Sequence, residues 1–444
     1  MNSDNRFYVR AYGCQMNQYE AGLVREILGR DGYTEVACET DADVILLLTC
    51  SVRKHAEQRA IGRLASLRGR KRSRPDLVLA VLGCTAQLRA RELSDGLGAD
   101  IVVGPDDYRR LPELIEAYRE QRTPQVAAQL TGECYEGIIP LADGPVTGMV
   151  GVMRGCNNYC AYCIVPYVRG AERSKSRAAI LAEVEHRLTQ GVRDITLVGQ
   201  NVLAYRDGDL DFVGLLQLVD RKVRDEALRP SHFVGARVRF LTSHPKDVTP
   251  ELAAAMRDLK SVCPHLHIPL QSGSNRVLAL MNRRHTREEY LARVNLLRRA
   301  VPDVSLTTDV LVGFPSESDQ DFEQTMEIVE QVRFDFAYMF RYSERPGTRA
   351  ALMEPKVPDE AARRRLSRLI AVQNRITREQ KELMVGRRFE VLVEARNGPD
   401  LLARTRTNKT VAVKQQVPIG ALLTVEVTGI QGWTPVARGV THDA

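Results

Sequence analysis

Three cysteines in the middle of the chain lie at the spacing C-x3-C-x2-C. They are Cys156, Cys160 and Cys163, and they follow an apolar segment that is typical of a β-strand. Three thiolates on one short loop can bind three irons of a 4Fe-4S cluster and leave the fourth iron open for a substrate or a cofactor. A structural zinc ion needs a fourth ligand, and no second Cys or Cys/His pair follows at zinc-finger spacing. The spacing therefore favours an iron–sulfur centre, with zinc as the alternative.

A second set of cysteines, Cys14, Cys50 and Cys84, is widely spaced along the first part of the chain. Each lies one or two residues beyond an apolar segment, and successive members are separated by about the length of one strand-helix unit. The carboxyl ends of parallel strands lie along one edge of a sheet, so loops after separate strands can bring the three thiols together there. We expect a second cluster at this edge, the alternative being three buried apolar cysteines.

The elements that must position these cysteines follow from the pattern of apolar residues. The first 105 residues alternate between apolar and amphipathic segments, which predicts a small, mostly parallel α/β sheet. After a polar connector the alternation resumes, and six strand-helix units predict an incomplete TIM-like barrel. The expected strands are 7–12, 44–48, 77–82 and 101–103 in the sheet, and 149–153, 195–198, 237–241, 266–270, 304–312 and 336–341 in the barrel; helices are expected near 17–30, 55–69 and 86–97.

The end of the chain has a different pattern. A charged helix is expected over residues 359–384, and short alternating strands then predict a small β-barrel. Its strands are expected at 389–394, 401–405, 411–413, 422–427 and 434–438. The fold class is therefore α/β, and we predict a parallel α/β domain over 1–121, a partial (βα)6 barrel over 142–380 and a small β-barrel over 382–444.

The composition limits the kind of protein this is. The 444 residues include 44% hydrophobic and 27% charged side chains, which predicts a folded protein of two or three domains. The longest apolar runs are far shorter than the roughly 18 residues that cross a bilayer, and the polar start is unlike a signal peptide. We expect no membrane segment and no secretion. Nine cysteines in such a chain indicate a reducing cytoplasm, where grouped thiols are more often metal ligands than disulfides.

The positive charge of the chain is unevenly distributed. The formal balance is 63 Lys and Arg against 56 Asp and Glu, a net charge of +7. Residues 51–75 alone hold nine Lys or Arg and one acidic residue, Glu57. This local excess suits a polyanion, while a solvated helix face followed by a basic loop is the alternative interpretation.

The C-x3-C-x2-C loop, with Tyr162 before the last cysteine and a βα barrel around it, resembles the radical S-adenosylmethionine (SAM) superfamily. Further segments are similar to the methylthiotransferase family within it, and they cover nearly the whole chain. They are 12–17 (YGCQMN), 49–53 (TCSVR), 83–84 (GC), 165–170 (VPYVRG), 199–202 (GQNV), 242–245 (TSHP), 267–274 (HIPLQSGS), 282–286 (NRRHT), 308–309 (TD), 313–315 (GFP), 342–343 (YS) and 345–348 (RPGT).

The resemblance implies the cofactors and the reaction. The cluster at Cys156, Cys160 and Cys163 would chelate SAM and reduce it to methionine and a 5′-deoxyadenosyl radical. A second 4Fe-4S cluster, held by the N-terminal cysteines, would carry the sulfur that is transferred, and another SAM would donate methyl. Residues that follow barrel strands would line the SAM pocket, with strand capping as the alternative for each polar residue. These candidates are Tyr162, Gln200, Asn201, Ser243 and Gln271.

The segments after Cys14, Cys50 and Cys163 are most similar to family members that methylthiolate C2 of N6-isopentenyladenosine at position 37 of tRNA. The alternatives are family members that act on threonylcarbamoyladenosine in tRNA or on an aspartate of a ribosomal protein. An alternative of another class is a non-catalytic RNA-binding protein with a redox-sensing cluster. The resemblance also implies an electron donor protein and a donor of sulfur or clusters as partners. Small departures, such as Leu48 where the family usually has Asn, leave all six cysteines in place.

The C-terminal β-barrel resembles a TRAM domain, the RNA-binding module that ends family members. Residues 386–440 hold eight Lys or Arg against four acidic residues. We expect Arg404, Arg406 and Lys409 to contact phosphates and Trp433 to offer a stacking surface for a base. The alternative is an ordinary solvated surface with Trp433 as core filler.

Overall fold

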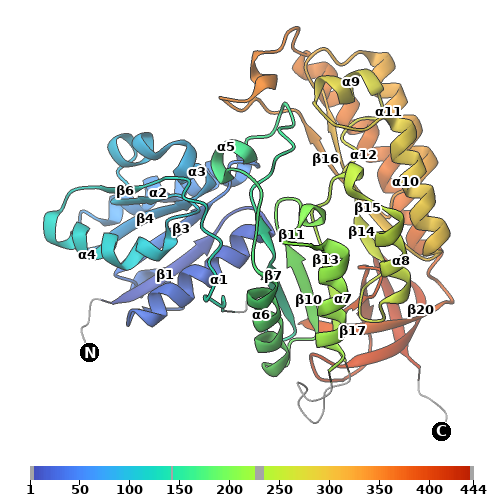
Figure 1. Ribbon diagram of the computed structural model, residues 1–444, viewed down its shortest axis with the longest axis horizontal. Helices are drawn as coiled ribbons and strands as arrows, with labels where there is room; N and C mark the ends of the chain where they lie inside the picture. The colour runs from blue at the N-terminus through green and yellow to red at the C-terminus, as the bar shows by residue number, and fades with distance from the viewer. Residues whose placement is uncertain (1–4, 142–143, 226–234, 441–444) are drawn as a thin grey trace.

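The computed structural model describes residues 5–141, 144–225 and 235–440. These residues form three units that follow one another along the sequence (Figure 1). An α/β unit lies at the left of that view, a partial barrel occupies the centre and right, and a small β-barrel lies at the lower right. The three-part α/β architecture expected from the sequence is confirmed.

The N-terminal unit is built on a parallel sheet of six strands in the order β2-β1-β3-β4-β5-β6. Separate apolar clusters cover its two faces. The central strands are buried over their whole length, which explains why they read as continuous apolar runs. The elements are β1 Arg6–Ala11, α1 Gln15–Arg30, β2 Thr34–Glu35, β3 Val44–Thr49, α2 Lys54–Arg70, β4 Val78–Gly83, α3 Cys84–Leu88, β5 Ile101–Val103, α4 Leu111–Gln121 and β6 Gln125–Ala127.

The sequence pattern gave no sign of β2 and β6. Both are sheet-edge strands of two or three residues, too short to show an alternation of apolar and polar side chains. Because β6 pairs with β5, the N-terminal sheet extends past residue 121, where the predicted domain ends. The helix expected near 86–97 is two shorter pieces, α3 and a π-helical turn over Glu92–Gly96.

The central unit carries six parallel strands in two groups of three, β7-β10-β13 and β14-β15-β16. An isolated bridge between Val238 and Val262 links the two groups. Each of the six main strands overlaps an expected one, although the strand expected over 266–270 spans only 265–267. Helices cover the outside of this open barrel (Figure 1). The elements are β7 Thr147–Gly151, β8 Met153–Arg154, α5 Val165–Arg169, β9 Arg173–Ser174, α6 Arg177–Thr189, β10 Asp194–Val198, β11 Arg206–Asp207, β12 Leu210–Asp211, α7 Phe212–Val223, β13 Arg237–Phe240, α8 Pro250–Asp258, β14 His265–His267, α9 Asn275–Leu280, α10 Arg287–Ala300, β15 Ser305–Val312, α11 Asp319–Val332, β16 Phe336–Arg341 and α12 Asp359–Glu382.

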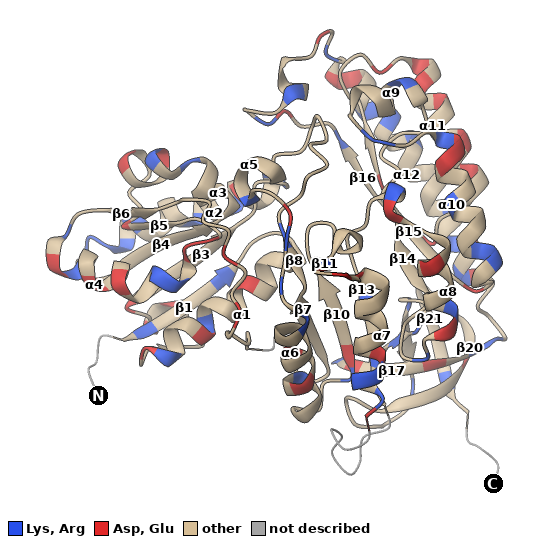
Figure 2. Cartoon of the chain, in the orientation of Figure 1, with Lys and Arg blue, Asp and Glu red and all other residues tan. Residues whose placement is uncertain are grey.

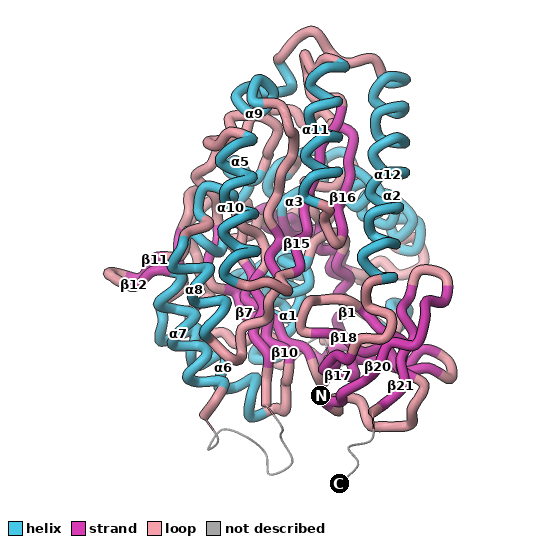
Figure 3. The backbone as a smooth tube through the Cα atoms, turned by 90° about the vertical axis from the view of Figure 1, so that its right-hand side faces the viewer, coloured by secondary structure: helices cyan, strands magenta, loops and turns pink. Residues whose placement is uncertain are grey.

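Helix α12 leads from the partial barrel to the C-terminal unit (Figure 3). That unit is a closed barrel of five strands in the order β17-β18-β19-β21-β20. Its interior is filled by the buried apolar residues of alternating strand positions, as the sequence predicted. The strands are β17 Arg388–Asn397, β18 Asp400–Thr405, β19 Thr410–Val413, β20 Leu422–Gln431 and β21 Thr434–Gly439.

Two buried arginines of β13 fasten the closed barrel to the partial barrel. Arg237 Nη1 donates to the backbone oxygen of Arg404 at 2.8 Å, and Arg239 Nη1 donates to that of Arg406 at 2.9 Å. Arg239 Nε also lies 2.8 Å from a carboxylate oxygen of Asp194, so its charge is paired inside the junction. Breaking such a buried contact is costly, and the two barrels are therefore joined at a defined angle.

Much of the charge on the outer helices is paired within the protein. In Figure 2 the acidic residues of α11 lie beside the basic residues of α12. Three ion pairs connect the two helices: Arg365–Asp319, Arg368–Glu323 and Arg375–Glu330. Cations without such a partner are therefore the ones available to a ligand. None of the described helices is both long and apolar enough to span a membrane.

Candidate functional site

The three N-terminal cysteines lie at the carboxyl ends of adjacent parallel strands. Cys50 follows β3 directly, Cys84 follows β4 directly, and Cys14 lies between β1 and α1. The strands β1, β3 and β4 are neighbours in the sheet, so the expected common edge is confirmed. A hydrogen bond from the Cys50 thiol is the main cause that lowers the pKa of Cys14 to about 6, while the pKa of Cys50 is raised.

Two glycines let the strand ends carry these thiols close together. Gly13 has a φ of +126°, and a Cβ there would lie 2.3 Å from the Cys50 Cβ. Gly83 has a φ of +92°, and a Cβ there would lie 2.7 Å from the backbone oxygen of Thr49. Any larger residue at these positions would both strain the backbone and separate the strand ends. Close approach of the cysteine-bearing loops therefore requires glycine immediately before Cys14 and Cys84.

The central cysteines lie on the loop between β8 and α5. Hydrogen bonds to the sulfur atoms orient two of them: Asn158 Nδ2 donates to Cys156 Sγ at 3.4 Å, and Arg283 Nη1 donates to Cys160 Sγ at 3.4 Å. Burial is the main cause that raises the pKa of Cys163, to about 12. Thiol groups that are buried and hydrogen-bonded in this way suit a ligated thiolate, whose charge a cluster and nearby donors would share.

Each cysteine set offers three thiols to a metal centre. Among the residues the structure describes, no three His, Cys, Asp or Glu side chains are close enough together to hold one ion. In a 4Fe-4S cluster each thiolate binds a different iron, so the sulfur atoms stand farther apart than around one zinc. Each set could supply one thiolate to each of three irons, so a cluster bound there would keep its fourth iron open.

The polar residues expected in the SAM pocket also lie at carboxyl ends of barrel strands, but several are already engaged. Gln200 Oε1 accepts the backbone N–H of Gly155 at 2.6 Å, which fixes the start of the cysteine loop. Asn201 Nδ2 donates to Asp247 at 2.9 Å, and its Oδ1 is buried without a partner among the described residues. A free acceptor beside the cysteine loop suits an ammonium group such as that of SAM.

Three further candidates line the same end of the barrel. Ser243 Oγ donates to the backbone oxygen of His267. Gln271 has a φ of +66°. Its backbone N–H donates to the backbone oxygen of Asp309 at 2.8 Å and its own backbone oxygen accepts from Leu311 at 2.9 Å, so its side chain remains available. Tyr162 packs partly buried against Phe314 and neighbouring apolar residues. Among the residues that the structure describes, the Gln271 side chain forms no hydrogen bond, and the binding of SAM by these three residues stays a prediction.

Helix α5 connects the two cysteine sets. It begins two residues after Cys163, and its Val168, together with Ile164, packs against Cys84 in one buried apolar cluster. From the end of α5, Arg169 Nε donates to Cys84 Sγ at 3.1 Å. The loop that carries the central thiols thus leads directly to a helix that contacts Cys84 of the N-terminal set.

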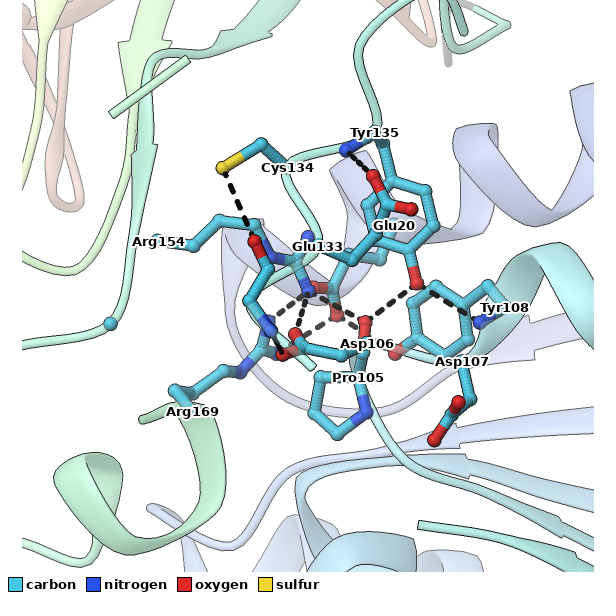
Figure 4. A network of polar contacts seen from close by, with 12 residues as sticks. Glu20, Pro105, Asp106, Asp107, Tyr108, Glu133, Cys134, Tyr135, Arg154 and Arg169 are labelled. Atoms are coloured by element: carbon cyan, nitrogen blue, oxygen red, sulfur yellow. Dashed lines mark hydrogen bonds and ion pairs between the residues drawn. The ribbon is translucent and has the colours of Figure 1, made fainter. Parts of the chain in front are cut away.

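A buried ion network holds this junction together (Figure 4). Arg169 and Arg154 of the central unit both bind the carboxylate of Glu20 in α1, with Arg154 Nη2 and Glu20 Oε1 2.8 Å apart. Tyr108 Oη donates to the same carboxylate at 3.1 Å. Burial alone would raise the pKa of Glu20, but the two arginines lower it below its usual value. Glu20 is therefore a buried anion that joins two domains, and spacing along the sequence gave no signal for it.

Removing Arg169 is expected to destabilise the protein strongly. The substitution Arg169→Met leaves the Glu20 carboxylate with one arginine in a buried site, and breaking such a pair costs about 3 kcal/mol. The measurement is the thermal unfolding midpoint, which should fall by several degrees. The matched control is Arg110→Met, which removes an arginine whose side chain is 48% exposed and paired with Glu113; such surface pairs contribute about 0–1 kcal/mol. Equal midpoints for the two variants would contradict this role.

Of the residues expected to bind RNA, one has an exposed side chain and three have side chains that contact other parts of the protein. The Trp433 side chain is 54% exposed, so it is not core filler. Arg404, by contrast, pairs with Glu394 at 2.6 Å. The Arg406 guanidinium donates to two backbone oxygens of the partial barrel at 2.7 and 2.9 Å, and Lys409 Nζ lies 2.6 Å from a carboxylate oxygen of Asp335 there. These two basic side chains therefore contribute to the junction of the barrels, and their contact with RNA remains a prediction.

Comparison with known proteins describes each unit. Residues 6–104 match Uncharacterized protein family UPF0004, residues 150–329 match the Radical SAM superfamily, and residues 382–437 match the TRAM domain. The tRNA-2-methylthio-N(6)-dimethylallyladenosine synthase of Chlorobaculum tepidum is 43% identical over 433 residues, which cover 95% of this chain and 95% of that protein. The chain belongs to the tRNA-2-methylthio-N(6)-dimethylallyladenosine synthase family. Membership of the Radical SAM superfamily implies a 4Fe-4S cluster and SAM as cofactors.

Other synthases of this family match over almost the same length. The synthase of Moorella thermoacetica is 42% identical and covers 96% of both chains, and that of Chlorobium limicola is 40% identical and covers 98% of both. Among solved structures, the radical S-adenosylmethionine methyltransferase TsrM from Kitasatospora setae superposes with a TM-score of 0.63 at 14% identity, over 79% of this chain and 77% of that one. At 14% identity, this structural similarity shows only that the chain shares the fold of a radical SAM enzyme.

Proposed function

We propose that the chain converts N6-dimethylallyladenosine in tRNA to its 2-methylthio derivative, at position 37 as the sequence resemblance implies. The observation that carries the proposal is the pair of three-cysteine sets on either side of α5, in a chain that is 43% identical over 95% of its length to a synthase of this name. A reaction that both activates a ring carbon and delivers sulfur needs two chemical centres close to one base, and this arrangement supplies two candidate sites.

The Cys156 loop is the proposed site of the radical SAM cluster. A 4Fe-4S cluster with SAM bound there supplies a 5′-deoxyadenosyl radical, an oxidant strong enough to remove hydrogen from an unreactive C–H bond. The protein's own part is positioning: Gln200 holds the start of the loop through Gly155, and Asn158 and Arg283 donate to its sulfur atoms. Tyr162, Gln200, Asn201, Ser243 and Gln271 are the proposed lining of the SAM site.

Cys14, Cys50 and Cys84 are the proposed ligands of a second cluster. Their convergence at one sheet edge, the contact between Cys14 and Cys50, and the cation of Arg169 beside Cys84 support this assignment. Thiolates gain from a neighbouring guanidinium because it offsets their negative charge. A cluster at this edge would lie next to α5, on the side of the N-terminal unit that meets the partial barrel.

The proposed RNA contact is the TRAM barrel. Trp433 presents an exposed indole, and Lys381 Nζ lies 5.6 Å from its ring centroid and donates to its backbone oxygen at 2.7 Å. An indole with a cation beside it suits stacking on a base next to a phosphate. An electron donor protein, a donor of sulfur or clusters, and action in the cytoplasm complete the proposal.

The product distinguishes this function from the alternatives. Anaerobic incubation of the cluster-containing protein with SAM, a reductant and tRNA bearing N6-dimethylallyladenosine should yield the 2-methylthio nucleoside, detected by mass spectrometry of the digested RNA. The matched control is tRNA that bears threonylcarbamoyladenosine, which should remain unchanged. Methylthiolation of the control alone would assign the other tRNA substrate instead. If 5′-deoxyadenosine forms while neither RNA changes, the proposed substrate is wrong although the radical chemistry is right.

A further inference from the structure

A hollow of about 300 Å³ opens beside the N-terminal cysteines, between the end of β1 and the start of α2. A hollow of this size is large enough for a phosphate group with part of its hydration shell. We refer to it as the anion hollow. Its lining includes Arg10, Tyr12, Gly13, Arg53, His55 and Arg59.

The cations of the anion hollow differ from the other basic residues of the segment 51–75. Four cations in the later part of this segment are paired with Glu39, Asp43 or Asp100, whereas Arg68 and Arg72 form no ion pair among the described residues. Within the described parts of the chain, Arg53, Arg59 and also Arg10 form no ion pair with any acidic residue. Of the cations in this segment without an ion pair among the described residues, Arg53 and Arg59 line the hollow together with Arg10. Lys54, Arg68 and Arg72 do not line it. The ion pairs in the later part of the segment are Arg63 and Arg70 with Glu39, Lys71 with Asp100, and Arg74 with Asp43.

The only acidic residue of the same segment does not compensate these cations. Glu57, in the first turn of α2, binds Arg89 Nη1 at 2.8 Å and Arg345 Nη1 at 3.3 Å. Its charge is thus already shared between two other arginines. The 17-residue helix α2 also directs the positive end of its dipole toward the hollow. Every nearby charge without an internal partner is positive, so the hollow favours an anion.

The guanidinium groups are also held in place. The Tyr12 side chain is buried, and the Cζ atoms of Arg10 and Arg59 lie 5.5 and 5.7 Å from its ring centroid. A ring face attracts a guanidinium, and two such groups on one ring reduce the conformational freedom that binding must remove. Planar guanidinium groups bind phosphate oxygens in pairs of parallel hydrogen bonds. Arg10 and Arg59 therefore share a buried ring as a common support, although their side chains, like that of Arg53, are exposed.

The position of the hollow suggests which anion it takes. Gly13 precedes the proposed cluster ligand Cys14, and Arg53 lies three residues after Cys50. From the partial barrel, Arg345 Nη2 donates to the backbone oxygen of Val52 at 2.9 Å, so the hollow lies at the meeting point of the two units. If the base of a nucleotide reaches the cysteines, the phosphates on either side of its ribose lie close to the cysteines as well. We propose that the anion hollow binds a backbone phosphate of the RNA beside the adenosine that is modified; this rests on the proposed function.

The test is RNA binding by the cluster-containing protein. The double variant Arg53→Gln/Arg59→Gln is compared with Arg68→Gln/Arg72→Gln, which removes two exposed arginines at the other end of α2. The probe is a fluorescent anticodon stem-loop RNA that contains N6-dimethylallyladenosine. Loss of one phosphate contact should weaken binding about tenfold near 50 mM salt and reduce the slope of log Kd against log salt by about 0.7. The control pair should change the affinity less than threefold, and iron and sulfide contents should stay equal in all three proteins.

Other outcomes overturn the inference. If the RNA affinity and the salt slope of the Arg53→Gln/Arg59→Gln protein are unchanged, the hollow does not contact a phosphate of the RNA. An equal loss in the control pair would mean that diffuse charge, not this hollow, attracts RNA. If the variant loses affinity for inorganic phosphate but not for RNA, the hollow holds a free anion instead. Loss of iron together with affinity would place the effect in the cluster. Failure of the proposed function is separate, since it appears as absence of 2-methylthio product from the wild-type protein while RNA binding is still measured.

Discussion

The substitution Cys156→Ala is expected to abolish reductive cleavage of SAM. The loop offers three thiols at C-x3-C-x2-C spacing, and a cluster that leaves one iron open for SAM depends on all three. Changes to residues that merely support a metal ligand cost about 10–100-fold, so loss of a ligand itself should reduce 5′-deoxyadenosine formation by more than about 100-fold. The measurement is chromatographic quantification of 5′-deoxyadenosine after anaerobic reduction in the presence of SAM, with iron content determined on the same sample.

A buried cysteine outside both sets provides the control for Cys156→Ala. Cys263 is 1% exposed and precedes β14, where it lies near Arg239 and not near the cysteine loop. Cys263→Ala should retain SAM cleavage and iron, even where it lowers stability. Normal 5′-deoxyadenosine formation by Cys156→Ala, or a loss as severe in Cys263→Ala, would contradict the assignment of the central loop.

The second large effect is expected from Cys14→Ala, and it should divide the reaction into two parts. Cys14 lies at the edge of the N-terminal sheet, in contact with Cys50, and it contributes no thiol to the central loop. SAM cleavage should therefore persist, while the 2-methylthio nucleoside should fall by more than about 100-fold because the proposed sulfur-carrying site has lost a ligand. Both products are quantified in one incubation with tRNA that bears N6-dimethylallyladenosine.

Cys38→Ala is the matched control for this experiment. Cys38 belongs to the same N-terminal unit, but its thiol is exposed and lies outside the shared sheet edge. Its removal should leave both 5′-deoxyadenosine and the methylthio product unchanged. Unimpaired methylthiolation by Cys14→Ala would show that the N-terminal thiols do not deliver sulfur, and loss of both products would show that the two sites do not act separately.

The sequence predicted those parts of the structure that depend on local pattern. The strand Val44–Thr49 is recognisable because a strand buried on both faces must be apolar throughout. The meeting of Cys14, Cys50 and Cys84 was predictable because adjacent parallel strands must end at one edge. By contrast, the strand Gln125–Ala127 is fixed only by pairing with β5, so three residues of sequence carried no signal for it.

The contacts between the units were not predictable in this way. Arg169 and Glu20 are 149 residues apart, and no periodicity connects residues that meet only after two domains pack. Basic side chains near the end of the chain were expected to bind phosphate because sequence alone does not show their partners. The structure places Lys409 against Asp335, 74 residues earlier, and Arg406 against backbone oxygens of the partial barrel. Composition indicates how much charge a segment holds, whereas tertiary packing decides which charges remain available.

The junction made by Arg237 and Arg239 has a consequence for how a long substrate is handled. Because these side chains bind backbone oxygens of the closed barrel, the indole of Trp433 and the mouth of the partial barrel stay at a constant separation. A module on a flexible tether could search for RNA and then swing inward, but a fastened one cannot. If one RNA contacts both surfaces, that RNA must bend to reach them, because the protein does not adjust the distance between them.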